Sequence, residues 1–305
     1  MKKHIIIGSR GSRLAKIQAR SVLAELEKTH PDIKFKLATI ATSGDRASSL
    51  STSRIPGQGI FVKEIEEALL SGKIDLAVHS LKDLPTEIPP GLSLAAVTRR
   101  FDPRDVLVSN RGKLDELPVN STIGTCSPRR TAQLLAYRHD LKVQPIRGNI
   151  DTRLQKVSSG EVSGIILAAA GMIRLGLNDM ITQYLPLELF LPAAGQAALG
   201  IESREKDKEI AALVSSLNHE PTWRSVSAER TFLYTLGAWC HTPVAALGTT
   251  AGNTIRLQGM VASSNGTRIL HDTEEGSTPE GVGSQLAKRM LRMGASELIM
   301  ETGAK

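Results

Sequence analysis

Residues 123–134 read IGTCSPRRTAQL, and this stretch decides the fold class. Ile123 and Gly124 end an apolar strand, Ser127 has the side chain of a helix N-cap, and Pro128 suits the first helical position. A strand that leads through a short loop into a helix is the repeating unit of α/β architecture. The sequence therefore predicts that this part of the chain belongs to an α/β domain.

The same unit recurs on both sides of this stretch, over the first two-thirds of the chain. The expected strands are residues 5–7, 35–40, 75–79, 92–97, 106–108, 143–146, 164–168 and 199–203. The expected helices are residues 14–26, 61–70 and 206–217, with three more that begin near residues 128, 150 and 170. From residue 221 the pattern changes to a long helix, three alternating strands and an amphipathic helix over 279–293, which is typical of a small α+β module.

The chain of 305 residues is long enough for two or three domains. We expect domain 1 to span 1–98 and 199–217, domain 2 to span 103–193, and domain 3 to span 221–305. The predicted architecture is two doubly wound α/β domains with a hinge, plus a small α+β third domain with an antiparallel sheet.

Composition narrows the class of protein. Hydrophobic residues make up 41% and charged residues 23%, which is typical of a globular protein. Neither a bilayer-spanning apolar stretch nor a signal-peptide h-region is present, so we expect a cytoplasmic protein without a membrane partner. The 2 cysteines are too few for a disulfide framework or a zinc site, and no metal is expected. Aromatic residues are only 3%, which argues against a nucleic-acid partner.

The arginines point to a ligand. The net charge is +7, and 22 of the 38 basic residues are Arg, which favours bidentate recognition of carboxylate or phosphate. Arg129 and Arg130 fall in the first turn of a helix, where the macrodipole disfavours each cation by roughly 0.3–1 kcal/mol. Either an anion lies between them, or the two are solvated surface residues.

The arrangement recurs at other strand ends. Arg10, Arg147, Arg153 and Arg174 each lie at the carboxyl end of an expected strand or near the helix that follows. In an open parallel sheet this edge is where ligands bind. No P-loop or Rossmann fingerprint occurs, so the arginines predict a cleft for several carboxylates.

Lys82 and Asp83 stand side by side where another expected strand ends. Such a pair is ordinary in a surface loop, but a carboxylate in an Arg-lined cleft also suits acid/base chemistry or stabilisation of a cation. Cys240 has two open interpretations, a small buried thiol and a covalent attachment point. Cys126 is interpreted as a small residue at a crowded turn.

Eight motifs in register then carry a family resemblance. They are RGSRLA from Arg10, TSGD from Thr42, GQGIFVKE from Gly57, DLAVHSLKDLP from Asp75, GTCSPRR from Gly124, RGNIDTR from Arg147, ILAAAGMIRLG from Ile166, and the region from AER to Cys240 and PV. Together they cover nearly the whole chain, which resembles the porphobilinogen deaminase (hydroxymethylbilane synthase) family.

The resemblance implies a transferase that joins four porphobilinogen molecules head to tail, with release of ammonia, into linear hydroxymethylbilane for haem and other tetrapyrroles. It implies a monomeric protein with one dipyrromethane cofactor per chain, held in a cleft between domains 1 and 2 and joined by a thioether to Cys240 of domain 3. Asp83 would be the catalytic carboxylate. The cofactor would be bound by Ser80, Lys82, Arg129, Arg130 and Arg147, and the substrate by Arg10, Ser12, Arg147, Arg153 and Arg174. Residues 46–59 would form a lid, with Phe61 near the cleft.

The chain departs from the family pattern at two positions. Gly195-Gln196-Ala197 stands where the family has Gly-Gln-Gly, and Ala238-Trp239 stands where it has Gly-Gly before the cofactor cysteine. A Trp in a loop that needed a positive φ would cost of order 1 kcal/mol. The alternative function is a non-enzymatic two-domain binding protein for a small polycarboxylate, which would need neither Asp83 nor Cys240.

Overall fold

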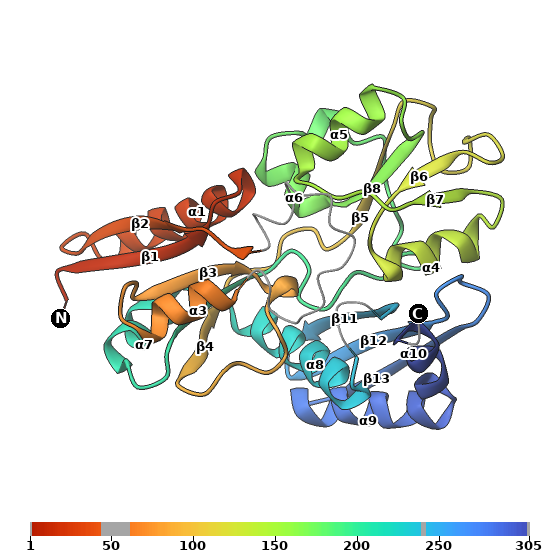
Figure 1. The fold of residues 1–305 in the computed structure, drawn as a ribbon. Coiled ribbons are helices and arrows are strands. Elements are labelled where there is room, and N and C mark those ends of the chain that lie inside the picture. Colours follow the sequence, from red (N-terminus) through yellow and green to blue (C-terminus); the bar gives the residue numbers. More distant parts are fainter. Residues whose placement is uncertain (1, 44–61, 239–241, 304–305) are drawn as a thin grey trace. The chain divides into compact units, whose positions relative to one another are not determined.

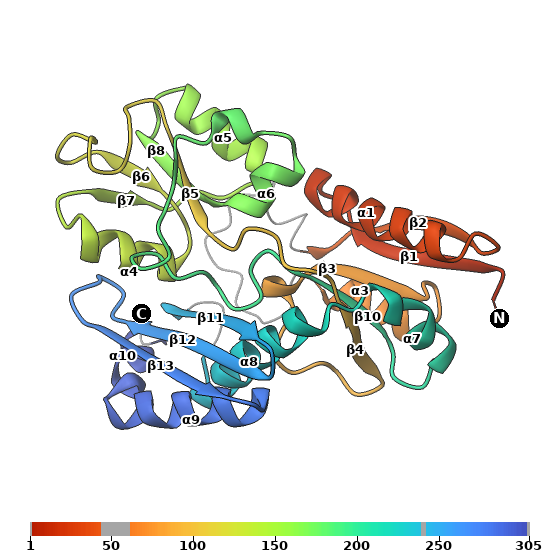
Figure 2. The same cartoon turned by 180° about the vertical axis from the view of Figure 1, so that it is seen from behind.

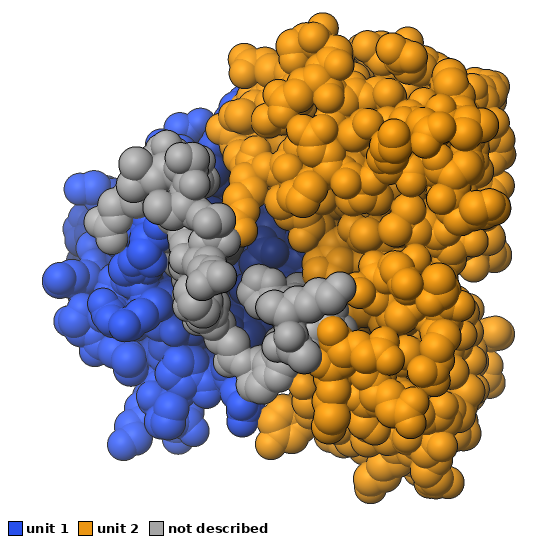
Figure 3. Space-filling view, turned by 45° about the vertical axis from the view of Figure 1, so that its right-hand side comes forward, with its two compact units in different colours: residues 1–101, 197–223 blue, residues 102–196, 224–305 orange. Residues whose placement is uncertain are grey.

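The computed structural model describes residues 2–43, 62–238 and 242–303 (Figure 1). The chain divides into two compact units, which Figure 3 colours blue and orange. Unit 1 comprises residues 1–101 and 197–223, and unit 2 comprises residues 102–196 and 224–305. The chain therefore leaves unit 1 after residue 101, returns to it at residue 197, and leaves it again after residue 223.

Unit 1 contains a five-stranded sheet in the order β2-β1-β3-β10-β4. Its strands are β1 (His4–Arg10), β2 (Lys34–Ile40), β3 (Leu76–Ser80), β4 (Leu92–Val97) and β10 (Leu199–Arg204). Its helices are α1 (Arg13–Thr29), α3 (Lys63–Leu70), α7 (Lys208–Val214) and the short 3-10 turns η1 (Leu81–Asp83) and η3 (Ser215–Leu217). β1 runs parallel to β2 and β3, whereas β10 runs antiparallel to both of its neighbours.

Both faces of this sheet are covered by helices. Leu76 and Val78 of β3 join a core with α1 and α7, whereas Ala77 between them joins a separate core with Ile65 of α3. Successive side chains of a strand point to opposite faces, so β3 is buried on both sides. This is why its sequence, LAVHS, is almost continuously apolar rather than alternating.

Unit 2 contains a second five-stranded sheet, in the order β7-β6-β8-β5-β9. Its strands are β5 (Asp105–Ser109), β6 (Thr122–Gly124), β7 (Lys142–Gln144), β8 (Gly164–Ala168) and β9 (Gln183–Tyr184). Its helices are α4 (Pro128–Tyr137), α5 (Ile150–Ser158), α6 (Ala169–Arg174) and the 3-10 turn η2 (Asn178–Met180). β6 pairs in parallel with β7 and β8, and β5 is antiparallel to β8 and β9. The plan repeats that of unit 1, with one reversed strand in fourth place.

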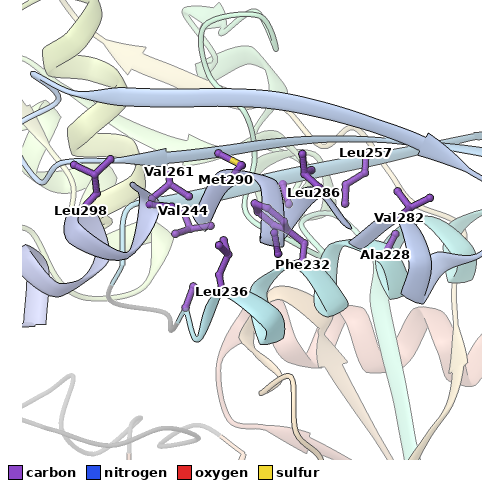
Figure 4. Packing of buried hydrophobic residues seen from close by; sticks show 14 of the residues in the cluster. Ala228, Phe232, Leu236, Val244, Leu257, Val261, Val282, Leu286, Met290 and Leu298 are labelled. Carbon is purple, nitrogen blue, oxygen red and sulfur yellow. The ribbon is translucent and has the colours of Figure 1, made fainter. Parts of the chain in front are cut away.

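Unit 2 also contains a smaller antiparallel sheet, β11-β12-β13. Its elements are β11 (Val244–Ala251), β12 (Thr254–Ala262), β13 (Ile269–Gly276), α9 (Pro279–Arg292), α10 (Ala295–Gly303) and α8 (Glu220–Leu236), whose residues 220–223 belong to unit 1. Figure 4 shows Phe232 of α8 and Leu286 and Met290 of α9 gathered against this sheet. The view from behind in Figure 2 shows the same layering of α9 on β12 and β13. The other face carries Met260 and Leu247, which pack with Ala132 of α4.

The structure confirms the predicted fold class, and it differs from the predicted elements in three respects. β5 and β10 run against their neighbours, and each is the first strand after the chain has crossed from the other unit. β9 and α10 were not predicted. In the helix expected over 14–26, apolar Leu14 and Ile17 were expected to line one face, but in α1 Ala15 and Gln18 are buried while Leu14 and Ile17 are only partly buried. Among the described helices, none combines the length and apolar character needed to cross a membrane.

Candidate active site

The predicted site residues of unit 1 meet at one edge of its sheet. Arg10 is the last residue of β1 and Ser80 the last of β3. Because these two strands are parallel neighbours, their carboxyl ends lie at the same edge. Ser12 follows as the N-cap of α1, and its Oγ accepts a hydrogen bond from the Ala15 amide at 3.3 Å.

Asp83 lies on the 3-10 turn η1 that leaves β3. Leu81 and Leu84 are buried, at 1% and 5% exposure, and they hold the two ends of the turn against the core. Lys82 between them is half-buried and Asp83 is exposed. The sequence therefore folds the apolar residues inward and presents the carboxylate outward at the edge that carries Arg10.

Two hydrogen bonds fix this turn to its surroundings. The Leu81 amide donates to the Ala198 carbonyl at 3.0 Å, just before β10. The Ser80 hydroxyl donates to Oε1 of Gln18 at 3.0 Å, and Gln18 is 4% exposed on α1. Gln18 was not predicted, because the hydrogen-bond partner of a buried polar residue on a helix cannot be identified until the neighbouring strand is known.

The predicted site residues of unit 2 likewise gather at the carboxyl edge of parallel strands. β6, β7 and β8 run in the same direction, and the chain leaves each of them toward α4, α5 or α6. The arginines on these connections and helices are Arg129, Arg130, Arg147, Arg153 and Arg174. The five arginines predicted in this part of the chain thus lie on the connections and helices that follow three parallel strands of unit 2.

Arg129 and Arg130 form a buried triad with Asp105, the first residue of β5. Nη1 of Arg129 lies 2.7 Å from Oδ2 of Asp105, and Nη2 of Arg130 lies 2.7 Å from Oδ1. The three side chains are 5%, 7% and 0% exposed, so the solvated-surface interpretation of the pair is wrong. The anion that compensates the two cations at the start of α4 includes a carboxylate of the protein itself.

The triad keeps an excess of positive charge, since it contains two guanidinium groups and one carboxylate. Their other acceptors are neutral carbonyl oxygens, Leu191 O for Arg129 and Ile166 O for Arg130. Burial would raise the pKa of Asp105, but the charges of Arg129 and Arg130 overcome this and hold that pKa far below its usual range. Burial also lowers the pKa of Arg129, despite the nearby carboxylate. An additional anion at this place would therefore be stabilising.

Arg147 and Arg153 flank the start of α5, as predicted. Asn149 is the N-cap and accepts a hydrogen bond from the Thr152 amide at 2.8 Å. Gly148 has φ +109°, and a Cβ there would lie 2.9 Å from the Thr152 side chain, so the tight entry to the helix requires glycine. Arg147 is exposed, whereas Nε of Arg153 donates to the Gly148 carbonyl at 2.9 Å.

Arg174 ends α6 and is half-buried. Burial lowers the pKa of Arg174 to about 10. A guanidinium group whose charge is disfavoured by its surroundings gains more than a solvated one from an incoming carboxylate.

Several predicted features lie outside the described residues. They are Cys240 with its neighbour Trp239, the expected lid over 46–59, and Phe61. Cys126 is exposed, so the turn is not crowded around its thiol, which donates to the Ile146 carbonyl at 2.8 Å. Within the described ranges, no group of three or more His, Cys, Asp and Glu side chains is arranged to hold a metal ion.

Asp105 was missed at the level of sequence. Its signal is a carboxylate at the start of an apolar strand, VLV, where a charged residue is expected to be paired if buried. Gln196 was noted only as part of a motif, yet its Nε2 donates to Oδ1 of Asp105 at 2.9 Å. Both residues belong to the surroundings of the arginine pair.

Comparison with known proteins gives matches over nearly the whole chain. A family profile described as "Porphobilinogen deaminase, dipyromethane cofactor binding domain" matches residues 5–212, and one described as "Porphobilinogen deaminase, C-terminal domain" matches residues 223–292. Three curated relatives are named porphobilinogen deaminase. The chain is 46% identical to the Desulforudis audaxviator protein, with 100% of this chain and 99% of that one covered. It is 44% identical to the Syntrophomonas wolfei protein (98% and 99%) and 47% identical to the Geobacillus kaustophilus protein (97% of each).

Proposed function

The chain belongs to the porphobilinogen deaminase family, and we propose that it joins four porphobilinogen molecules head to tail into hydroxymethylbilane, releasing ammonia at each step. Its residues 5–212 match that family's dipyrromethane cofactor binding domain. The proposal makes the protein a transferase of tetrapyrrole synthesis whose product stays bound to a covalent primer until four units have been added.

The observation that carries the proposal is the buried excess of positive charge at the edge of the second sheet. Each pyrrole of the cofactor and the growing product carries an acetate and a propionate. The net charge of +1 on the triad of Arg129, Arg130 and Asp105 suits such an anion, and Arg147, Arg153 and Arg174 lie on the same edge. A charge-assisted hydrogen bond to each carboxylate contributes roughly 1.5–3 kcal/mol.

These residues fit the cofactor that the family implies. Bound through Cys240, the dipyrromethane would supply a free pyrrole α-position to which the first substrate is added. Its carboxylates would be held by Ser80, Lys82, Arg129, Arg130 and Arg147. The carboxylates of the substrate would be held by Arg10, Ser12, Arg147, Arg153 and Arg174.

We assign Asp83 the catalytic role. Positive charge develops on the substrate as ammonia leaves, and an exposed carboxylate on a fixed turn can stabilise it or accept a pyrrole N–H hydrogen bond. The two tethers of the turn, Leu81 N to Ala198 O and Ser80 Oγ to Gln18 Oε1, limit how far the carboxylate can move. Positioning of this kind contributes to catalysis because the carboxylate need not be reorganised during the reaction.

We further propose that the chain has three functional domains. Domain 1 comprises residues 1–98 and 199–217, domain 2 residues 103–193, and domain 3 residues 221–305. In support, the two sheets of unit 2 have cores of their own, one around Val106 and Ile165 and the other around Phe232 and Leu286. Limited proteolysis that releases a folded fragment beginning near residue 221 would agree with this division. Simultaneous loss of both sheets would contradict it.

The intact mass of the purified protein tests the covalent primer. We expect a mass above 32.8 kDa by one dipyrromethane, and the mass of the bare chain in a Cys240→Ser variant. Cys126→Ser is the matched control, because it removes the other cysteine and should leave the excess mass in place. A fully active wild-type protein with the bare mass would overturn the proposal.

We further propose that the protein is a monomer, that it acts in the cytoplasm and that it does not bind nucleic acid. Light scattering on the purified protein should give a single species near 32.8 kDa, and a stable dimer would contradict this. A non-enzymatic receptor for a polycarboxylate is not favoured, because both matching family profiles are those of porphobilinogen deaminase.

A further inference from the structure

The carboxylate of Asp105 accepts hydrogen bonds from three different side chains. Its Oδ2 accepts a hydrogen bond from Nη1 of Arg129 at 2.7 Å. Its Oδ1 accepts hydrogen bonds from Nη2 of Arg130 at 2.7 Å and from Nε2 of Gln196 at 2.9 Å. All four residues are at most 6% exposed. We call this cluster of Asp105, Arg129, Arg130 and Gln196 the Asp105 node.

Gln196 connects the node to the backbone at the point where the chain changes units. Its Nε2 also donates to the Pro103 carbonyl at 2.8 Å, and residue 196 is the last of unit 2 before the chain enters unit 1. The single amide group therefore joins the returning segment of chain to the segment that leads into β5. Gln196 is 1% exposed, and a buried amide needs hydrogen-bond partners such as Asp105 and the Pro103 carbonyl.

The composition of the node is unfavourable for a purely structural element. Buried ion pairs are often replaced by apolar residues without loss of stability, and this one has unequal charges. In addition, Nε of Arg130 is buried and has no hydrogen-bond partner in the described part of the chain. The node thus carries one more positive than negative charge, and one of its donors lacks a partner among the described residues.

We propose that Asp105 and Gln196 are positioning residues that orient Arg129 and Arg130 toward the carboxylates of the cofactor and the growing product. This rests on the proposed function. Each oxygen of Asp105 holds one guanidinium group, so the carboxylate sets the direction of both. Gln196 shares Oδ1 with Arg130 and thereby fixes the rotation of the carboxylate, while neither Asp105 nor Gln196 touches the ligand.

The Gln196→Met variant tests the proposal, because it keeps the volume of the side chain and removes the amide. We expect the KM for porphobilinogen to rise about fivefold, which corresponds to the loss of roughly one hydrogen bond. The kcat of the cofactor-loaded protein should stay within about twofold of the wild-type value. A readout independent of turnover is the fraction of chains that carry the cofactor, measured by intact mass after apoprotein is incubated with limiting porphobilinogen. That fraction should fall.

A pair of carboxylate-to-amide variants separates positioning from stability. Glu229 is as buried as Asp105, at 0% exposure, and accepts hydrogen bonds from the amides of Gly195 and Gly248, both at 2.7 Å. Asp105→Asn and Glu229→Gln should both lower the midpoint of thermal unfolding. Of these two variants, only Asp105→Asn should raise the KM for porphobilinogen. This rise should be larger than the one in Gln196→Met. If Asp105→Asn does not fold, Gln196→Met still tests the proposal.

The outcomes distinguish this inference from the proposed function. An unchanged KM and unchanged cofactor loading in Gln196→Met, together with a raised KM in Arg130→Lys, would overturn the positioning role alone. An equal rise of KM in Glu229→Gln would also overturn it, because any loosening of unit 2 would then have the same effect. Wild-type KM and loading in both Arg129→Lys and Arg130→Lys would instead contradict the proposed function.

Discussion

Ala197 has a backbone conformation that its side chain disfavours. Its φ is +74°, in the left-handed region, and it is 7% exposed at the point where the chain returns to unit 1. The described part of the chain has one other non-glycine residue with positive φ, Asn120, and asparagine tolerates this conformation better than alanine. The position therefore stores strain that a glycine would relieve.

The Ala197→Gly variant should be more stable than the wild type by about 0.5–1 kcal/mol. Relief of the left-handed strain contributes roughly 1–2 kcal/mol, and the greater entropy of glycine in the unfolded chain offsets part of it. Urea unfolding measures the difference. Ala198→Gly is the control, because Ala198 is 1% exposed and lacks a positive φ, and it should lose stability. A loss of stability in Ala197→Gly would show that the strain is compensated elsewhere.

Asp83→Asn should lower kcat by about 10² to 10³ while the protein keeps its fold and its cofactor. The reason is the loss of an anion that stabilises positive charge as ammonia leaves, an effect of the size seen for preorganised electrostatic groups. Steady-state kinetics with porphobilinogen measure it. Glu87→Gln is the matched control, because Glu87 is also an exposed carboxylate shortly after η1. Near-wild-type turnover in Asp83→Asn would remove Asp83 from the mechanism.

At this scale the sequence predicts residues whose signal is local. Ser127 was expected as an N-cap, and the structure confirms it. Asp105 and Gln18 were not predicted, because their partners lie 24 and 62 residues away in the chain. Pairing at such separations depends on which strands become neighbours, and no local pattern contains that information.

Among the elements, α4 has an unusual start. Its first turn holds two arginines and no acidic residue, against the preference of the helix dipole. The compensation comes from outside the helix, through Asp105, and from the Ser127 side chain, which accepts from the Arg130 amide at 3.4 Å. α4 therefore depends on its cap and on β5 for the stability of its first turn.

Ser127→Ala should lower the free energy of unfolding by about 0.5–1 kcal/mol. The value lies in the lower part of the range for N-caps because the hydrogen bond is long. Chemical denaturation measures it, with Ser158→Ala as the control. Ser158 is the exposed last residue of α5, where the change should be below about 0.5 kcal/mol. Equal effects of the two substitutions would contradict the capping role.

Elements with a clear local pattern were predicted. α1 and β8 show clear periodicity or a continuous apolar run, whereas β9 has only two residues and therefore no pattern to detect. The direction of β5 and β10 was beyond prediction for another reason. Each is the first strand after the chain crosses between units, and a crossing depends on the connection rather than on the pattern within the strand.

For the whole molecule, buried and paired carboxylates determine the response to acid. The Arg289 side chain lowers the pKa of Asp272 through a hydrogen bond, and the two arginines of the Asp105 node lower that of Asp105 against the effect of burial. A depressed folded-state pKa means that the fold binds fewer protons than the unfolded chain. Such a carboxylate contributes its full share to the stability of the fold when the pH is above its unfolded-state pKa of about 3.9. This contribution is lost as the pH falls through its folded-state pKa.

The midpoint of thermal unfolding should therefore change little between about pH 7 and pH 5 and fall steeply below about pH 4. In Asp105→Asn the midpoint should be lower at neutral pH, and its fall below pH 4 should be less steep, because one titrating group is absent. Calorimetry across this range measures both. An identical slope in the variant and the wild type would show that Asp105 does not contribute to acid unfolding.

The place of β10 in its sheet has a consequence for how the protein is synthesised. Among the described strands, β4 is hydrogen-bonded to β10 alone, yet β4 ends at Val97 and β10 starts at Leu199. The ribosome delivers the N-terminal end first, so β4 waits with open edges while the large sheet of unit 2 is translated. A premature stop codon in the middle of the gene would therefore yield a chain with an unpaired strand, a target for chaperones and proteases rather than a partly working enzyme.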